Sequence, residues 1–202
     1  MIITWHGESC IKIQSGETVI YLDPIQQPGF TPPRFSKATI VALTNDTGKQ
    51  DFPKDTFVVS EPGEYEVAQV FFYAYPWYDN GDRRNIFSIE MEGMTLVHLG
   101  NIHESLGDDV LENLEGADVV MVPVGGQGVY DAKKASEVIA SIEPRIVIPM
   151  SYSVKGVDVK RDTLSPFAKE MGISASEPLD KLKMSARDLP QGEMRILPLV
   201  KQ

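Results

Sequence analysis

Histidine and cysteine limit the chemistry available to this chain, because both are scarce. The 202 residues contain three histidines, His6, His98 and His103, and a single cysteine, Cys10. One cysteine cannot form an intramolecular disulfide and cannot build a four-thiolate zinc site. Three histidines cannot supply a dinuclear metal centre that needs five. The counts therefore exclude a secreted disulfide scaffold and two common kinds of metal site.

The positions of these four residues favour structural roles. His6 and His98 lie on or beside expected strands, where a histidine is more often packed and hydrogen-bonded than a metal ligand. His103 precedes an expected helix and is expected at the surface or near the helix cap. Cys10 opens an apolar strand, so we expect a buried small hydrophobic residue rather than a nucleophile.

Elements that position these residues are read from hydrophobic periodicity and turn residues. Helical spacing of apolar residues predicts helices over residues 106–114, 132–142 and 162–171, with Asp131 as an N-cap and Gly172 after the last helix. Turns are expected at Ser15-Gly16 and Asn80-Gly81. Strands are expected over residues 2–4, 10–14, 18–22, 38–44, 57–60, 65–75, 86–91, 95–99, 117–124, 145–149 and 194–200.

Composition places the chain among globular proteins. Nineteen Lys and Arg against 29 Asp and Glu give a net charge of −10, so the totals show no basic surface for nucleic acid. The N-terminus lacks the regions of a signal peptide. The most apolar stretches, residues 67–78 and 119–124, are shorter or more interrupted than the ~20 residues that span a bilayer. We expect a cytoplasmic protein with no membrane partner and a single domain over residues 1–202.

The two halves of the chain resemble each other weakly. Residues 13–20 are similar to residues 90–97, and residues 38–41 to residues 117–120, at nearly the same offset. This similarity indicates either a duplicated β-sandwich with helices outside or merely two unrelated hairpins.

Six segments stand in an order and spacing typical of one family. They are Ile3-Thr4-Trp5 through Ser9-Cys10, Leu22-Asp23-Pro24, Pro62-Gly63-Glu64-Tyr65-Glu66-Val67, His98-Leu99-Gly100-Asn101, Val122-Pro123-Val124-Gly125-Gly126 and Ile148-Pro149-Met150-Ser151-Tyr152. Together they resemble the metallo-β-lactamase superfamily, in the branch similar to L-ascorbate-6-phosphate lactonases and related uncharacterised hydrolases. The resemblance implies an α/β (α+β) fold, a four-layer αββα sandwich with its site at the strand ends.

The resemblance also implies zinc as the cofactor, bound by a His-x-His-x-Asp-His loop, two further histidines and a bridging aspartate. A bound metal lowers the pKa of water to about 7 and so generates hydroxide. This chain departs from the ligand set throughout. Asn45, Thr47 and Gln50 replace the loop histidines, Lys49 replaces the loop aspartate, Tyr78 and Ser151 replace the further histidines, Asn101 replaces the bridging aspartate, and Glu8 replaces the histidine of an early Gly-His-Ser-Cys pattern. The usual dinuclear centre cannot be assembled, so no metal cofactor is expected.

Lys49 is the most informative of these replacements, because an ammonium group is incompatible with an adjacent Zn²⁺ unless it is deprotonated. It is either a solvated loop lysine or a source of the positive charge that metals give in the family. In the second case Glu8, Asp23 or Asp46 is its partner.

The first functional hypothesis is a metal-free, catalytically degenerate member, a pseudoenzyme that acts in binding or assembly and takes a small-molecule ligand. Its vestigial pocket is expected to contain Glu8, Asp23, Asn45, Asp46, Thr47, Lys49, Gln50, Tyr78, Asp79, His98, Asn101 and Ser151.

Three alternatives stay open. A hydrolase of phosphoesters or lactones would bind one hard cation, Mg²⁺ or Mn²⁺, through Glu8, Asp23, Asp46, Asp79 and His98. A nucleophile pocket of Ser151, His98 and Asn101 is a further possibility. A homo-oligomer is expected because the lactonase-like relatives can oligomerise.

Overall fold

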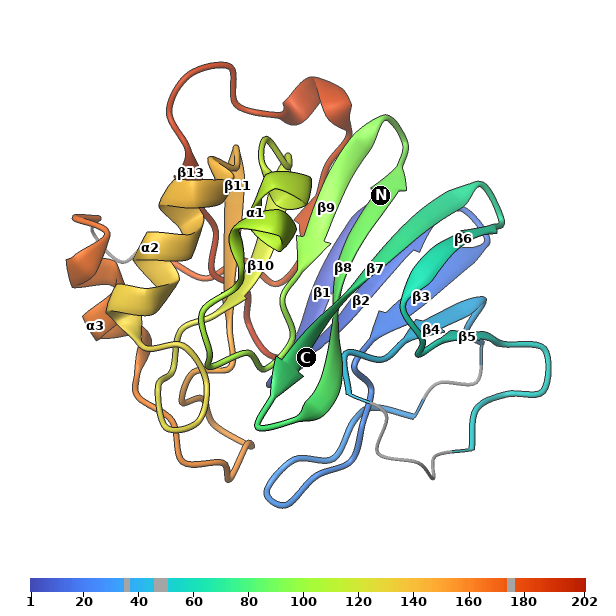
Figure 1. Cartoon of the computed structure of the whole chain (residues 1–202), viewed down its shortest axis with the longest axis horizontal. Helices are drawn as coiled ribbons and strands as arrows, with labels where there is room; N and C mark the ends of the chain where they lie inside the picture. Colours follow the sequence, from blue (N-terminus) through green and yellow to red (C-terminus); the bar gives the residue numbers. More distant parts are fainter. Residues whose placement is uncertain (35–36, 46–50, 174–176) are drawn as a thin grey trace.

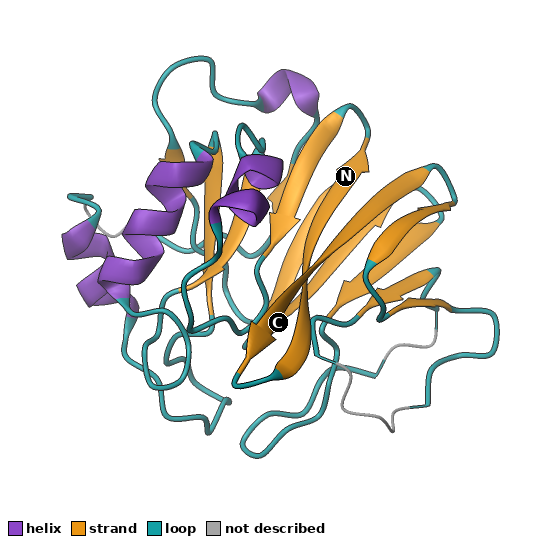
Figure 2. Ribbon diagram, in the orientation of Figure 1, coloured by secondary structure: helices purple, strands orange, loops and turns teal. Residues whose placement is uncertain are grey.

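The computed structural model describes residues 1–34, 37–45, 51–173 and 177–202, which form two packed β-sheets with helices outside one of them (Figures 1 and 2). The first sheet has the order β12-β1-β2-β3-β4-β5 and the second β13-β11-β10-β9-β8-β7-β6. The strands of the first are β1 (Ile2–Gly7), β2 (Cys10–Ser15), β3 (Thr18–Leu22), β4 (Ile40–Ala42), β5 (Phe57–Val59) and β12 (Leu182–Lys183). Those of the second are β6 (Gly63–Val67), β7 (Val70–Asp79), β8 (Asp82–Met91), β9 (Met94–His98), β10 (Val119–Pro123), β11 (Ile146–Met150) and β13 (Arg195–Ile196).

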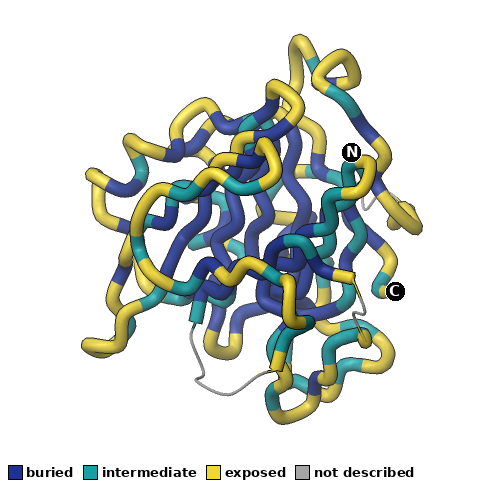
Figure 3. Tube along the Cα trace, turned by 90° about the vertical axis from the view of Figure 1, so that its right-hand side faces the viewer, coloured by how far each residue is buried: buried dark blue, intermediate teal, exposed yellow. Residues whose placement is uncertain are grey.

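One apolar core joins the two sheets. Alternation along β1 buries Ile3 and Trp5, and these side chains belong to the same cluster as Phe72 and Phe87 of the second sheet. Every residue of β10 and β11 is buried, because a helix covers one face of these parallel strands and the other sheet covers the opposite face. Figure 3 shows this distribution, with buried strands inside and exposed loops around them.

The helices are α1 (Asp108–Leu114), α2 (Ala132–Ile142) and α3 (Leu164–Glu170), with a 3₁₀ turn, η1, over Ala186–Asp188. Helix α2 buries Ala135, Val138, Ile139 and Ile142 against the second sheet, as the spacing predicts. Asp131 caps it by accepting a hydrogen bond from the Lys134 backbone amide at 2.9 Å. The predicted sandwich class is confirmed.

The outer face of the first sheet is covered differently. There Tyr21, Val41 and Leu43 form a small apolar cluster that packs against Ile25 and Phe52 from loops. Within the described residues, this layer is built from loop and the opposite outer layer from helix.

Residues 65–75 were predicted to form one strand, but they belong to two strands, β6 and β7, which pair as a hairpin. The chain turns at Ala68 and Gln69, with φ of 52° and 63°, and separates β6 from β7. Neither residue is the Gly, Asn or Asp that usually marks such a turn, so the sequence carries no local signal for it. The expected turn at Asn80-Gly81 is confirmed and connects β7 to β8.

The C-terminal tail also differs from the expected strand over residues 194–200. Only Arg195–Ile196 forms a strand beside β11, and Leu199 makes an isolated bridge with Leu179. No helix of the described residues has the length and apolarity needed to cross a membrane.

Acid sensitivity of folding is expected from His6 on β1. Burial, followed by the charges of Lys12 and Lys201, lowers the pKa of His6 from 6.5 to about 4. The unfolded chain then binds a proton below about pH 6.5 that the folded chain does not, so stability falls as pH drops from 6.5 towards 4. We expect His6→Gln to lose less stability than the unmodified chain between pH 7 and pH 5 in urea unfolding. Equal losses would contradict this role of His6.

Candidate functional site

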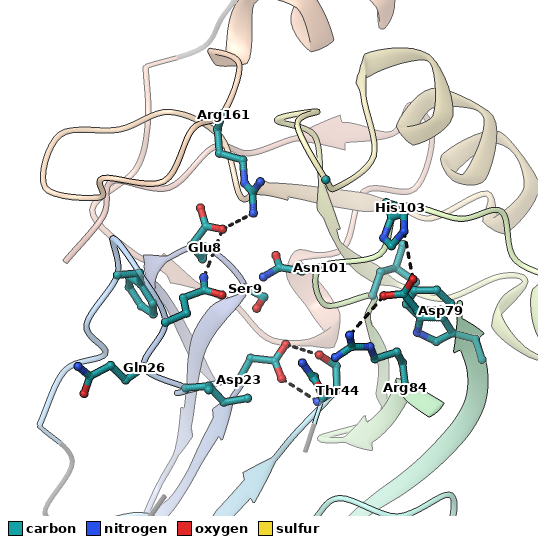
Figure 4. A pocket seen from close by; sticks show the side chains of 17 residues that line it. Glu8, Ser9, Asp23, Gln26, Thr44, Asp79, Arg84, Asn101, His103 and Arg161 are labelled. Carbon is teal, nitrogen blue, oxygen red and sulfur yellow. Dashed lines mark hydrogen bonds and ion pairs between the residues drawn. The ribbon is translucent and has the colours of Figure 1, made fainter. Parts of the chain in front are cut away.

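A pocket of about 280 Å³ lies where strand ends of both sheets meet (Figure 4). The β1–β2 turn contributes Glu8 and Ser9, and the segment after β3 contributes Asp23. The second sheet contributes Asp79 from the end of β7 and Arg84 from the start of β8. Side chains far apart in the sequence are therefore brought to one edge.

The backbone at this edge is held in left-handed conformations. Glu8, Asp23 and Ser151 have φ of 46°, 48° and 53°, a region that non-glycine residues rarely adopt. Gly100 has φ of 62°, and a Cβ there would lie 2.5 Å from Thr44 Oγ1, so only glycine fits. Strained backbone conformations persist only where the surrounding structure maintains them, and they are often found at functional sites.

Asp23 joins the two sheets beneath the pocket. Its Oδ1 accepts a hydrogen bond from the Thr44 backbone amide at 2.7 Å, and Oδ2 accepts one from Thr44 Oγ1 at 2.7 Å. His98 Nε2, at the end of β9, lies 3.1 Å from the same Oδ2. All three residues are buried. Both oxygens of the Asp23 carboxylate are therefore in contact with groups of the chain itself.

Glu8 and Arg161 form a buried ion pair at one wall. Arg161 Nη2 lies 2.6 Å from Glu8 Oε2, with side-chain exposures of 9% for Arg161 and 1% for Glu8. Arg161 Nη1 donates to the Gln127 carbonyl at 2.6 Å, and Gln27 Nε2 donates to Glu8 Oε2 at 3.4 Å. The pair connects the loop between β11 and α3 to the β1–β2 turn.

Asp79 lies at the opposite wall, where it contacts the guanidinium group of Arg84 and the imidazole of His103. Arg84 Nη2 donates to Asp79 Oδ2 at 3.3 Å, and His103 Nε2 lies 3.2 Å from Asp79 Oδ1. The His103 ring also meets the Trp77 indole edge to face, with centroids 6.2 Å apart. Arg84 and His103 keep 21% and 30% of their side-chain surface exposed, so they remain reachable from the pocket.

The predicted pocket residues are brought together in part. Glu8, Asp23, Asn45, Asp79 and Asn101 line the pocket.

Two further predicted residues lie directly behind this lining. His98 is bonded to Asp23, and Ser151 Oγ donates to Asn101 Oδ1 at 2.7 Å. Among the described contacts, none links Ser151 to His98, so the nucleophile pocket of Ser151, His98 and Asn101 is reduced to a Ser–Asn pair.

Tyr78 lies outside the pocket, with 65% of its surface exposed. It follows Trp77 and precedes Asp79 on β7, and alternation sends it to the other side of the strand from both. Asp46, Thr47, Lys49 and Gln50 lie outside the described residues, so the pairing of Lys49 with Glu8, Asp23 or Asp46 stays a prediction.

Sequence reasoning missed Arg84, Arg161 and Trp77 and assigned His103 to the surface. No local motif marks them, because each becomes relevant only through a partner supplied by another segment. Cys10 is buried as predicted, and burial together with the Asp23 charge raises the pKa of its thiol.

The described donors do not fit a zinc centre. No group of three or more His, Cys, Asp and Glu side chains among the described residues is arranged to hold a metal ion. Asp23 is bonded to Thr44 and His98, and Asp79 is shared by Arg84 and His103. A cation at these carboxylates would compete with contacts that the chain itself already makes.

The Asp23 contact predicts a stability effect. Thr44→Val removes the hydroxyl donor and leaves a buried carboxylate oxygen with one donor fewer, which costs about 1–3 kcal/mol. We expect a lower free energy of unfolding in urea for this variant. Thr18→Val is the matched control, because Thr18 is half-buried on β3 and makes no side-chain hydrogen bond in the described contacts. Equal effects of the two substitutions would contradict a special role for the Asp23–Thr44 bond.

Comparison with known proteins gives a family match and several relatives. A family model described as a beta-lactamase superfamily domain matches residues 2–151. A UPF0173 metal-dependent hydrolase of Pyrococcus abyssi is 28% identical over 99 residues, which are 45% of this chain and 44% of the relative. A UPF0173 protein of the same organism is 23% identical over 184 residues, covering 77% of this chain and 85% of that protein. The chain thus spans less than half of the first relative and most of the second.

A solved structure from Thermotoga maritima covers nearly the whole chain. It is 25% identical, has a TM-score of 0.81 and covers 98% of each chain. Its description proposes a zinc-dependent hydrolase of the metallo-beta-lactamase superfamily. The family match ends at residue 151, so Arg161 lies beyond it.

Proposed function

We propose that this chain, which belongs to the beta-lactamase superfamily, binds a small polar molecule in the strand-end pocket without a dinuclear metal centre. The observation that carries the proposal is the state of the carboxylates. Asp23 is held by Thr44 and His98, and the two walls are closed by Glu8–Arg161 and Asp79–Arg84 pairs. The pocket lies at strand ends, where the resemblance implies the site, and its described residues offer polar side chains that pair with one another.

A metal-dependent hydrolase is the second candidate, and the comparisons favour it over a binding or assembly role. Several relatives are named metal-dependent hydrolases, among them those from Pyrococcus abyssi and Thermococcus onnurineus. Glu8 Oε1 is a buried carboxylate oxygen that has no hydrogen-bond partner in the described structure, and Asp46 lies outside that structure. These oxygens are the donors in this chain through which a hard cation would bind.

Two further features belong to the proposal. We propose a cytoplasmic location, and the net charge of −10 supports the solubility that it requires. A homo-oligomer is supported by the family resemblance. Light scattering at high protein concentration tests the oligomer, and a monomer there would remove it.

Metal content distinguishes the two candidates. We expect elemental analysis of the protein, expressed in zinc- and manganese-rich medium, to find far less than one metal ion per chain. We also expect no hydrolysis of phosphodiesters or lactones that disappears on chelation and returns with Mn²⁺.

The matched comparison is the variant Asn45→His, Thr47→His, Lys49→Asp, Gln50→His, which rebuilds the His-x-His-x-Asp-His loop and is expected to retain more zinc. Stoichiometric metal in the unmodified chain, or activity that follows added metal, would overturn metal-free binding in favour of the hydrolase.

A further inference from the structure

Several buried polar atoms of the residues that line this pocket have no hydrogen-bond partner in the described structure. Three of the five buried side-chain polar atoms that lack a partner in the described structure belong to residues lining it: Glu8 Oε1, Trp77 Nε1 and Arg161 Nε. Folded proteins leave few such atoms, and each calls for a bound group or a local rearrangement. Two of the three are donors and one is an acceptor. A bound group that satisfied all three atoms would therefore accept more hydrogen bonds than it donates.

Arg84 adds further donors. Its contact with Asp79 uses Nη2, and no contact of the described residues uses Nε or Nη1. His103 shares the same carboxylate and is 30% exposed. Figure 4 shows Arg84 and His103 on the side of the pocket facing Arg161 and Glu8. Guanidinium groups match the oxygens of carboxylates and phosphates, often in pairs of parallel hydrogen bonds.

The charge balance limits what such a ligand carries. Glu8 is compensated by Arg161, and Asp23 by the donors of Thr44 and His98. Asp79 faces the Arg84 guanidinium and the His103 imidazole. Three lining carboxylates against two guanidinium groups leave no surplus of positive charge, so only an oxyanion of the lowest charge is expected here.

We propose that the pocket holds a singly charged oxyanion that has an adjacent O–H group, with Arg84, Arg161 and His103 as its hydrogen-bonding partners. The oxyanion accepts from the guanidinium groups and from Trp77 Nε1, and the O–H donates to Glu8 Oε1. A hydroxycarboxylate and a hydrogen phosphate in its singly charged form, H2PO4⁻ or ROPO3H⁻, share this chemistry. The inference rests on the proposed function, because it specifies the ligand of the same metal-free pocket.

Nuclear magnetic resonance of the tryptophan indoles tests the proposal directly. The chain has two tryptophans, so the indole N–H region contains two signals. Trp5 Nε1 is already bonded to the Glu8 carbonyl at 2.7 Å, whereas Trp77 Nε1 has no partner in the described structure. Trp77→Phe assigns the signals. We expect sodium glycolate or inorganic phosphate, in metal-free buffer, to shift the Trp77 signal saturably, beyond sodium chloride of matched ionic strength.

Variants decide where the anion binds. Arg84→Gln removes one guanidinium at a partly exposed position and is expected to weaken binding at least about tenfold. His103→Gln is a second variant that removes the imidazole from the same wall, with the same direction of effect. Arg83→Gln is the matched control, because the neighbouring arginine pairs with Glu61 and does not line the pocket. Dispersed amide signals verify that each variant is folded.

The outcomes separate this inference from the proposed function. A shift with glycolate alone supports a hydroxycarboxylate, and a shift with phosphate alone supports a hydrogen phosphate. No saturable shift with either anion, or equal affinity of Arg84→Gln and Arg83→Gln, overturns the inference. If glycerol shifts Trp77 while both anions fail, the pocket binds small polar molecules as proposed above but takes no oxyanion. Metal content is measured separately, so a metal-loaded protein would overturn the proposed function alone.

Discussion

The buried carboxylate of Asp23 is the contact on which the pocket depends. It follows β3, receives two hydrogen bonds from Thr44 after β4, and meets His98 at the end of β9. Strand ends of both sheets are thereby fixed around one negative charge. Each charge-assisted hydrogen bond contributes about 1.5–3 kcal/mol, a large part of the 5–15 kcal/mol typical of whole proteins. The left-handed backbone of Asp23 is maintained by the same contacts.

The charge pairs around Asp23 give the pocket a chemistry different from that of a zinc enzyme. A metal centre collects neutral imidazoles and carboxylates around a cation. Here the carboxylates of Glu8 and Asp79 contact arginines, while Asp23 contacts Thr44 and His98. The scaffold of the superfamily is therefore present, while the described side chains at its edge pair with one another. Several relatives are named metal-dependent hydrolases, whereas the described side chains of this chain include no group arranged to hold a metal ion.

The sequence predicted most of the scaffold and only part of the pocket. The buried strands β10 and β11 and the cap of α2 by Asp131 were predictable because their signals are local. The turn at Ala68 and Gln69 was not, because neither residue prefers the conformation that it adopts.

Pocket residues were found where the family resemblance assigned them, as for Glu8 and Asp79, and missed where it did not. Arg161 lies 153 positions from Glu8, and no periodicity relates residues at that distance. Tyr78 was expected in the pocket because its position in the chain matched, but strand alternation turns it to solvent.

The Glu8–Arg161 pair limits which amino-acid substitutions this chain can accept during evolution. Loss of one partner of a buried ion pair leaves the other charge uncompensated and costs about 3–5 kcal/mol. Selection would remove most chains that altered either position alone. Residues 8 and 161, which lie 153 positions apart, are therefore expected to be inherited as a unit.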